Sequence, residues 1–175
     1  MQKDRPYLRA DVEVSEGPVG RTAALPALPD AWTDFSYPDD AQIYHGHVFR
    51  GVTGTHFDRE TGWGRIASLS LEELVGESRV VGWTVPSCVL DAAFYACGIH
   101  LWVHGGQAVS LPRAIDRMQL GRPARAGETC LVYFVCREIA DRSACYDFTV
   151  VGEDCGILVA AQGYRKVILA RGGAQ

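Results

Sequence analysis

One stretch of the chain, from Val80 to Gly106, contains neither lysine nor arginine and a single acid, Asp91. Burying a carboxylate is costly, so a folded protein normally keeps one in apolar surroundings only with a partner or a chemical task. The stretch is long enough for a membrane span, but Asp91 near its middle, Pro86 and two histidines argue against one. We therefore expect a helix buried in the core of a globular domain.

The residues at both ends of this stretch predict where the helix begins and ends. Thr84 or Ser87 can serve as the N-cap, and Pro86 suits the first turn. Gly105 and Gly106 are typical of a helix C-terminus. A helix of about five turns with so little polar surface must be covered by other parts of the chain.

The rest of the sequence predicts strands that supply this cover. FRGVTGTHFD and GWGRIASLSL resemble two short strands around a turn. Five later segments are rich in Val, Ile, Tyr, Phe and Cys, which makes seven strand-like segments in all: AVSLP, AIDRMQL, TCLVYFVCREI, ACYDFTVV and ILVAAQGYRKVIL. Turn residues separate them, and GEDCG between the last two is typical of a hairpin. The pattern predicts an α+β fold in which a curved antiparallel sheet wraps one long apolar helix.

The first part of the chain has a different character. RPYLRADVEV alternates polar and apolar residues like a strand, and EGPVGRTAALPALPDAW, with three prolines, resembles an extended linker. We therefore expect residues 1–33 to be an N-terminal strand and linker. Residues 34–170 should form the globular domain.

Composition narrows the functional classes. The chain has 175 residues, enough for one domain, and a net charge of −4 without a Lys/Arg patch, which argues against nucleic-acid binding. No apolar signal segment opens the sequence, and the six cysteines contain no CxxC pair. We expect a cytoplasmic protein with reduced cysteines that binds neither nucleic acid nor membrane.

Asp91 and Tyr95 are the candidate catalytic pair. They are four residues apart, so they share one face of the helix. A carboxylic acid held against apolar walls keeps its proton to higher pH and can act as a general acid toward a leaving hydroxyl. Alternatively, Asp91 caps a backbone amide or pairs with a buried arginine. The residues alone leave both interpretations open.

A metal site is a weaker hypothesis. His100 and His104 share a helix face, and one of His45, His47 and His56 would have to provide the third ligand. Histidines that are packed or face solvent are the simpler interpretation. We therefore predict no metal.

Four segments occur in the order found in a known family. They are YHGHVFRGV, PSCVLDAAFYA, LPRAIDRMQL and ACYDFTVVGEDCGILVAAQGYRKVIL. They resemble the Tyr-x-x-x-Gly-Pro-x-Phe-Gln-Gly segment, the His-Pro-x-Leu-Leu-Asp-Ala-Ala motif, the following Leu-Pro strand and the closing hairpin of dehydratase domains. These domains belong to polyketide synthases and related fatty-acid synthases. The resemblance covers about residues 40–169.

The resemblance implies a hot-dog fold, two of which lie side by side in a whole dehydratase domain with the site between them. A histidine of the first hot dog takes the α-proton of a 3-hydroxyacyl thioester carried on the phosphopantetheine of an acyl carrier protein. A helix aspartate of the second helps the β-hydroxyl leave as water. This chain resembles the second, C-terminal half, with Asp91 as the acid and Tyr95 in place of the Gln or His that orients it.

Further expectations follow from the same resemblance. Its motifs place Tyr44, Gly46, His47, Phe49 and Pro86 at the substrate. No cofactor is expected besides the phosphopantetheine of the acyl carrier protein. The expected partners are that carrier protein and a second hot dog, either another half or a second copy of this chain.

The sequence also departs from the family pattern. It has no His-x-x-x-Gly-x-x-x-x-Pro motif, and His47, Arg50, Tyr95 and the pair Pro86 and Ser87 replace the usual residues. A second hypothesis is therefore an inactive dehydratase-like scaffold or acyl-binding module. A third is an acyl-thioester hydrolase, because hydrolases of this fold also carry an acid on the central helix.

Overall fold

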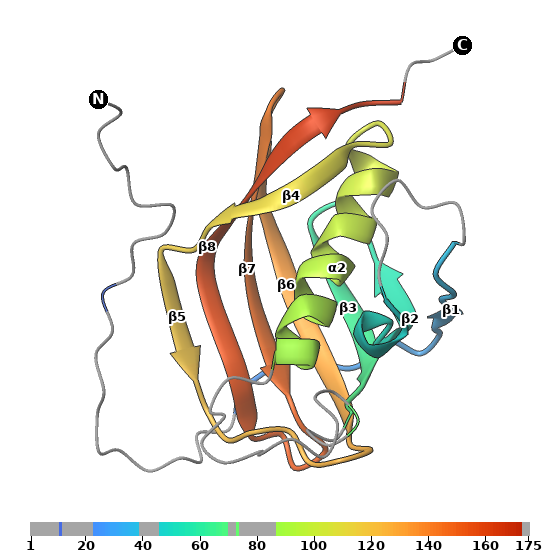
Figure 1. Cartoon of the computed structure of the whole chain (residues 1–175), viewed down its shortest axis with the longest axis vertical. Helices are drawn as coiled ribbons and strands as arrows, with labels where there is room; N and C mark the ends of the chain where they lie inside the picture. Colours follow the sequence, from blue (N-terminus) through green and yellow to red (C-terminus); the bar gives the residue numbers. More distant parts are fainter. Residues whose placement is uncertain (1–10, 12–22, 39–45, 70–72, 74–86, 173–175) are drawn as a thin grey trace.

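The computed structural model describes residues 11, 23–38, 46–69, 73 and 87–172 (Figure 1). Two helical elements are defined within these residues, the 3-10 turn η1 (His47–Phe49) and the α-helix α2 (Ser87–His104). The strands are β1 (Thr33–Asp34), β2 (Val52–Phe57), β3 (Thr61–Ala67), β4 (Val109–Ala114), β5 (Arg117–Leu120), β6 (Thr129–Ile139), β7 (Ser143–Val151) and β8 (Ile157–Ala170).

The strands form one antiparallel sheet in the order β1-β2-β3-β6-β7-β8-β4, with β5 also paired to β8. Helix α2 lies against one face of this sheet (Figure 1). The predicted antiparallel sheet is confirmed, and each of the seven strand-like segments overlaps one of its strands. The GEDCG turn closes the β7–β8 hairpin, where the amide of Gly152 donates to the carbonyl of Gly156 at 3.0 Å.

Small side chains let α2 approach the sheet closely. Its buried residues recur every three or four positions: Val89, Ala92, Ala93, Ala96, Cys97, His100 and Leu101. Opposite them, a Cβ added to Gly64 of β3 would lie 3.2 Å from Cβ of Ala96 and 2.8 Å from Cγ1 of Val132. Gly64 and Ala96 therefore meet where any larger side chain would separate helix from sheet.

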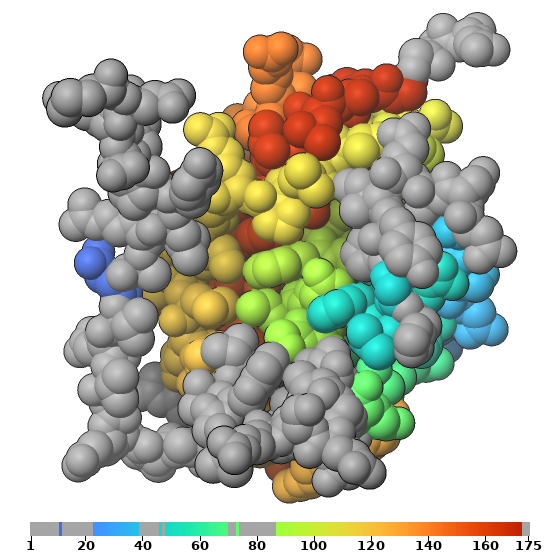
Figure 2. Space-filling model, viewed as in Figure 1, coloured from blue at the N-terminus to red at the C-terminus, as the bar shows by residue number. Residues whose placement is uncertain are grey.

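The described strands cover the apolar helix only in part. Trp102 and Val103 in its last turn are 41% and 56% exposed. Part of α2 also reaches the surface between the β4–β5 side and η1 (Figure 2). Among the helices that the structure describes, none combines the length and apolarity that crossing a bilayer requires.

The segment before the sheet is only partly described. The predicted strand RPYLRADVEV lies outside the described residues except for Asp11. After it, the amide of Ala23 donates to the carbonyl of Cys155 at 3.4 Å, and Trp32 lies 4.6 Å from the Arg65 guanidinium. Residues 23–32 therefore lead from the β7–β8 turn to the β2 edge. The predicted boundary at residue 34 stays a prediction.

A bulge in β8 decides which of its side chains face the helix. Gly163 has a φ of 63°, and its amide donates to Oδ1 of Asp147 at 2.8 Å. The β7–β8 register shifts here, between the pairs Tyr146–Tyr164 and Phe148–Ala161. Ala161 is buried before the bulge and Tyr164, Lys166 and Ile168 after it, so the extra residue changes the phase of alternation.

The close contact of α2 with β3 predicts that Gly64→Ala destabilises the fold by about 1 to 3 kcal/mol, because the added methyl overpacks the helix–sheet contact. The matched control is Gly54→Ala on the neighbouring strand, where the nearest atoms to an added Cβ are 3.6 Å away. Denaturant unfolding of both variants measures the difference. Equal unfolding midpoints would contradict this description of the core.

Candidate functional site

Asp91 and Tyr95 lie along one side of α2. Asp91 is partly exposed, and its Oδ2 atom is buried. The ring of Tyr95 stacks on that of Tyr37, with centroids 4.6 Å apart and planes 17° apart, and Phe35 meets Tyr95 edge-on at 5.8 Å. The segment after β1 therefore fixes the Tyr95 ring beside the helix acid.

Tyr37 belongs to the same neighbourhood, although the sequence analysis did not select it. Its hydroxyl accepts from the amide of Val52 at 3.0 Å and donates to the carbonyl of Phe49 at 3.4 Å. Burial raises the pKa of Tyr37 well above its usual range, and the charges of Tyr95 and Asp91 add to the rise. Tyr37 is therefore a neutral hydroxyl within electrostatic reach of Asp91.

The turn η1 contributes the predicted substrate contacts that the structure describes. The amide of Phe49 donates to the carbonyl of Gly46 at 2.9 Å, closing the turn, and Phe49 is 36% exposed. Just after the turn, a Cβ added to Gly51 would lie 3.3 Å from Cβ of Ala92, the neighbour of Asp91. The end of η1 therefore lies close to the helix turn that carries Asp91.

The other predicted contacts are described less fully. His47 lies in η1, but its side chain is outside the described part of the chain. Tyr44 and Pro86 lie outside the described residues altogether. The assignment of all five residues to substrate binding stays a prediction.

Lys166 is a buried cation that the sequence analysis missed. It is 3% exposed, and its Nζ donates to the Tyr164 hydroxyl at 3.2 Å and to the Phe94 carbonyl at 3.4 Å. Burial lowers the pKa of Lys166 to about 8, while Cys97 and Asp91 oppose that shift. The signal in the sequence was Gly163, since a bulge there turns Lys166 inward.

His100 is a core residue rather than half of a metal site. Its Nε2 lies 3.1 Å from the Asp58 carbonyl and its Nδ1 3.1 Å from the Tyr146 hydroxyl. A carbonyl only accepts, so Nε2 carries the proton and Nδ1 accepts from Tyr146. Burial lowers the pKa of His100, and His104 lowers it further. No group of three metal-binding side chains occurs among the described residues.

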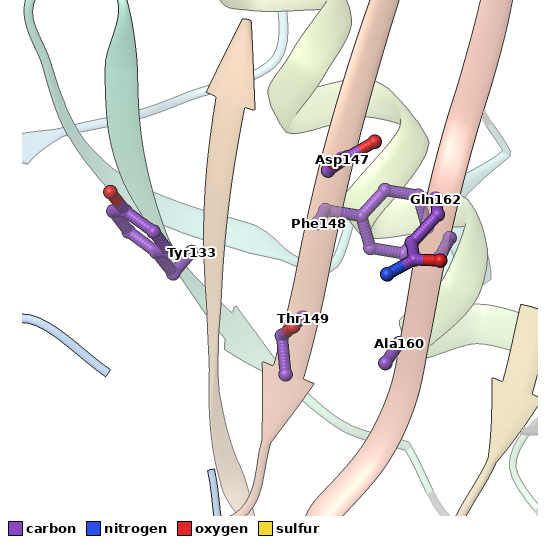
Figure 3. Close-up of a pocket in the computed structure, with 7 residues that line it drawn as sticks. Tyr133, Asp147, Phe148, Thr149, Ala160 and Gln162 are labelled. Carbon is purple, nitrogen blue, oxygen red and sulfur yellow. The ribbon is translucent and has the colours of Figure 1, made fainter. Parts of the chain in front are cut away.

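A shallow hollow of about 140 Å³ lies between β6, β7 and β8, away from the candidate pair. Its lining includes Tyr133, Asp147, Thr149 and Gln162 (Figure 3). Asp147 is already engaged there, because its Oδ2 accepts from the Arg137 guanidinium at 2.5 and 2.9 Å. This hollow offers no acid available for general acid chemistry.

Comparison with protein families identifies the chain. Residues 37–175 match the family described as the polyketide synthase dehydratase N-terminal domain. The chain therefore belongs to the polyketide synthase dehydratase family. Because the matching family describes the N-terminal domain, the prediction that this is the C-terminal half is not confirmed. No curated protein matches the sequence.

Solved structures agree on the fold. The chain is similar to GphF dehydratase 1, with 14% identity, a TM-score of 0.59, and coverage of 73% of this chain and 46% of that one. It is similar to a trans-acyltransferase polyketide synthase enoyl-isomerase, with 18% identity, a TM-score of 0.56 and coverage of 69% and 46%. The chain thus spans slightly less than half of these proteins.

A third neighbour is a single small protein. It is a hypothetical thioesterase from Streptococcus pneumoniae, solved with coenzyme A, with 5% identity and a TM-score of 0.52. The match covers 67% of this chain and 85% of that one. These likenesses support the hot-dog fold.

The burial of Lys166 predicts that the free energy of unfolding depends on pH. Its pKa is about 8 in the folded chain against an ordinary value of 10.5, so the folded state loses this proton at lower pH than the unfolded state. Between pH 8 and 10.5, the free energy of unfolding of the native chain should therefore rise by about 3 kcal/mol more than that of Lys166→Met. Urea unfolding at a series of pH values measures it. A constant difference across this range would contradict the prediction.

Proposed function

We propose that this chain is the aspartate-bearing hot dog of a polyketide synthase dehydratase. The observation that carries the proposal is the placement of Asp91, a half-buried residue of α2 whose neighbour Ala92 lies close to Gly51, just after η1. The family match supports the reaction class. The helix acid, together with the missing His-x-x-x-Gly-x-x-x-x-Pro motif, supports the second half of the dehydratase over the first.

The reaction would remove water from a 3-hydroxyacyl thioester. A base on another hot dog takes the α-proton, the C–H electrons form the α,β double bond, and the bond to the β-oxygen breaks. Asp91 gives its proton to that oxygen, which leaves as water. The products are a 2-enoyl thioester and the Asp91 carboxylate, which regains its proton before the next turnover.

Tyr95 would orient the acid. Its ring is held between Tyr37 and Phe35, so its hydroxyl has few positions open to it. A phenol donates one hydrogen bond and stays neutral at physiological pH. Tyr95 can therefore hold Asp91 in place without competing for the proton that the substrate receives.

The proposed site needs a partner. The chain spans 46% of GphF dehydratase 1, so a second hot dog would supply the histidine base. An acyl carrier protein would deliver the substrate on its phosphopantetheine past Gly46 and Phe49 of the η1 turn, with Tyr44, His47 and Pro86 alongside. Within this proposal, residues 34–170 form the hot dog and residues 1–33 join it to the preceding half.

One observation favours a different activity. The streptococcal thioesterase is a hot-dog neighbour of which the chain matches 85%, so a single hot dog of this size accounts for most of that protein. An acyl-thioester hydrolase would use Asp91 to direct water at the thioester carbonyl and release a free thiol. An inactive scaffold would use it for neither reaction.

We expect the chain, mixed with a dehydratase first half that carries the histidine motif, to convert a 3-hydroxyacyl carrier protein into its 2-enoyl form. Asp91→Asn should lower this rate by at least about 100-fold, because the amide has no proton to give. Mass spectrometry of the carrier-bound product, which is lighter by one water, measures it. The matched control is Asp116→Asn, an exposed carboxylate paired with Arg165 on the surface.

An unchanged rate in Asp91→Asn would refute the assignment of the acid. No dehydration with any first half would favour the scaffold. The hydrolase is tested separately with the chain alone, on acyl thioesters and a thiol-reactive dye. Thiol release that requires Asp91 would replace the dehydratase proposal, whereas we expect none.

A further inference from the structure

Lys166 is unusual both in the sequence and in the fold. Of the 17 basic side chains, only Lys3 and Lys166 are lysines. Lysine is almost never fully buried unless it is paired, yet Lys166 is 3% exposed. None of the steps proposed for the dehydration involves Lys166.

The ammonium group lies against the helix face that carries Asp91. Its Nζ donates to the carbonyl of Phe94, three residues after Asp91, and a Cβ added to Gly98 would lie 3.5 Å from Nζ. Positions 91, 94 and 98 follow one side of a helix. The missing side chain at Gly98 leaves room for the ammonium group, and the Tyr164 hydroxyl at 3.2 Å holds it from the other side.

The groups facing Lys166 come from three elements. Cys97 and Asp91 lie on α2, Tyr164 on β8, and Tyr146 on β7 interacts with Cys97 and Tyr164. Burial raises the pKa of the Cys97 thiol to about 12 and that of both phenols beyond their usual range. These three groups are therefore neutral at physiological pH. Asp91 supplies the carboxyl among the groups facing Lys166.

Asp91 also interacts with groups other than Lys166. Tyr37 and Tyr95 are phenols whose pKa values burial raises, so they remain neutral. Arg50 adds a second positive charge to this neighbourhood, since it opposes the rise in the pKa of Tyr37. The Oδ2 atom of Asp91 is buried, so water screens its interaction with Lys166 less than it would at the surface.

We propose that Lys166 is a positioning residue that acts through Asp91, its buried ammonium group stabilising the negative charge that Asp91 acquires when it gives up its proton. The inference rests on the proposed dehydratase function. Lys166 makes and breaks no bond and does not touch the substrate. It makes Asp91 a stronger acid at the moment when the β-hydroxyl needs the proton.

The first test follows the Asp91 carboxyl directly and needs no activity. Carbon-13 NMR of the full chain, labelled at aspartate and assigned with Asp91→Asn, gives the pH midpoint of its titration. In Lys166→Met the midpoint should move up by about one pH unit, because the stabilising charge is gone. Arg165→Met is the matched control, since it removes a charge from the next residue of β8 on the exposed side. It should leave the midpoint unchanged.

The reciprocal test keeps Lys166 in place. Because the coupling is mutual, Asp91→Asn should lower the titration midpoint of the Lys166 ammonium by the same amount. Lysine-selective NMR resolves it readily in a chain with two lysines. If Lys166→Met does not fold, this measurement by itself tests the inference. Midpoints that stay fixed in both experiments would overturn the inference and leave Lys166 as a structural hydrogen-bond donor.

Dehydration by the mixture of this chain and a first half then tests whether the coupling between Lys166 and Asp91 affects activity. In Lys166→Met the alkaline limb of the kcat profile should move to higher pH, while the plateau at lower pH falls by about threefold, because the acid is weaker. A uniform loss at all pH values would indicate a merely structural role and overturn the inference. If the NMR midpoints shift but Asp91→Asn retains full dehydration, the coupling stands and the proposed dehydratase function fails.

Discussion

The contact between the alanine face of α2 and the glycine of β3 determines the rest of the structure. Ala96 lies so close to Gly64 that a side chain added at position 64 would crowd both the helix and Val132 of the neighbouring strand. With the buried face fixed in this way, Asp91 and Tyr95 lie at the edge of the contact, next to η1 and the segment after β1. The position of the candidate acid is therefore a consequence of backbone packing, whatever chemistry it performs.

The sequence predicted the strands and the helix because their signals are local. A continuous apolar run with one acid specifies a packed helix, and alternating segments with turn residues between them specify an antiparallel sheet. The described strands cover the helix only in part, since Trp102 and Val103 are exposed. Apolarity indicates that a helix tends to be buried, but it does not specify which of its residues the rest of the fold covers.

Lys166 and Tyr37 escaped the sequence analysis for a different reason. Both depend on contacts between distant segments, and neither belongs to a local motif. Lys166 faces inward only because Gly163 interrupts the alternation of β8, and Tyr37 reaches the helix because β1 pairs with the β2 edge. The histidine pair on α2 is the opposite case, because here a local pattern suggested a site. His100 and His104 have the spacing of metal ligands, but His100 is a packed residue that is hydrogen-bonded to the Asp58 carbonyl and the Tyr146 hydroxyl.

The bulge at Gly163 limits how the last strand can evolve. Because the bulge adds one residue to β8, deleting Gly163 would leave a regular strand in which Tyr164, Lys166 and Ile168 still face the helix. Deleting Arg165 while the bulge stays would instead turn Lys166 and Ile168 away from the helix. Loss of a single residue should therefore be tolerated at the bulge and purged in the part of the strand that follows it.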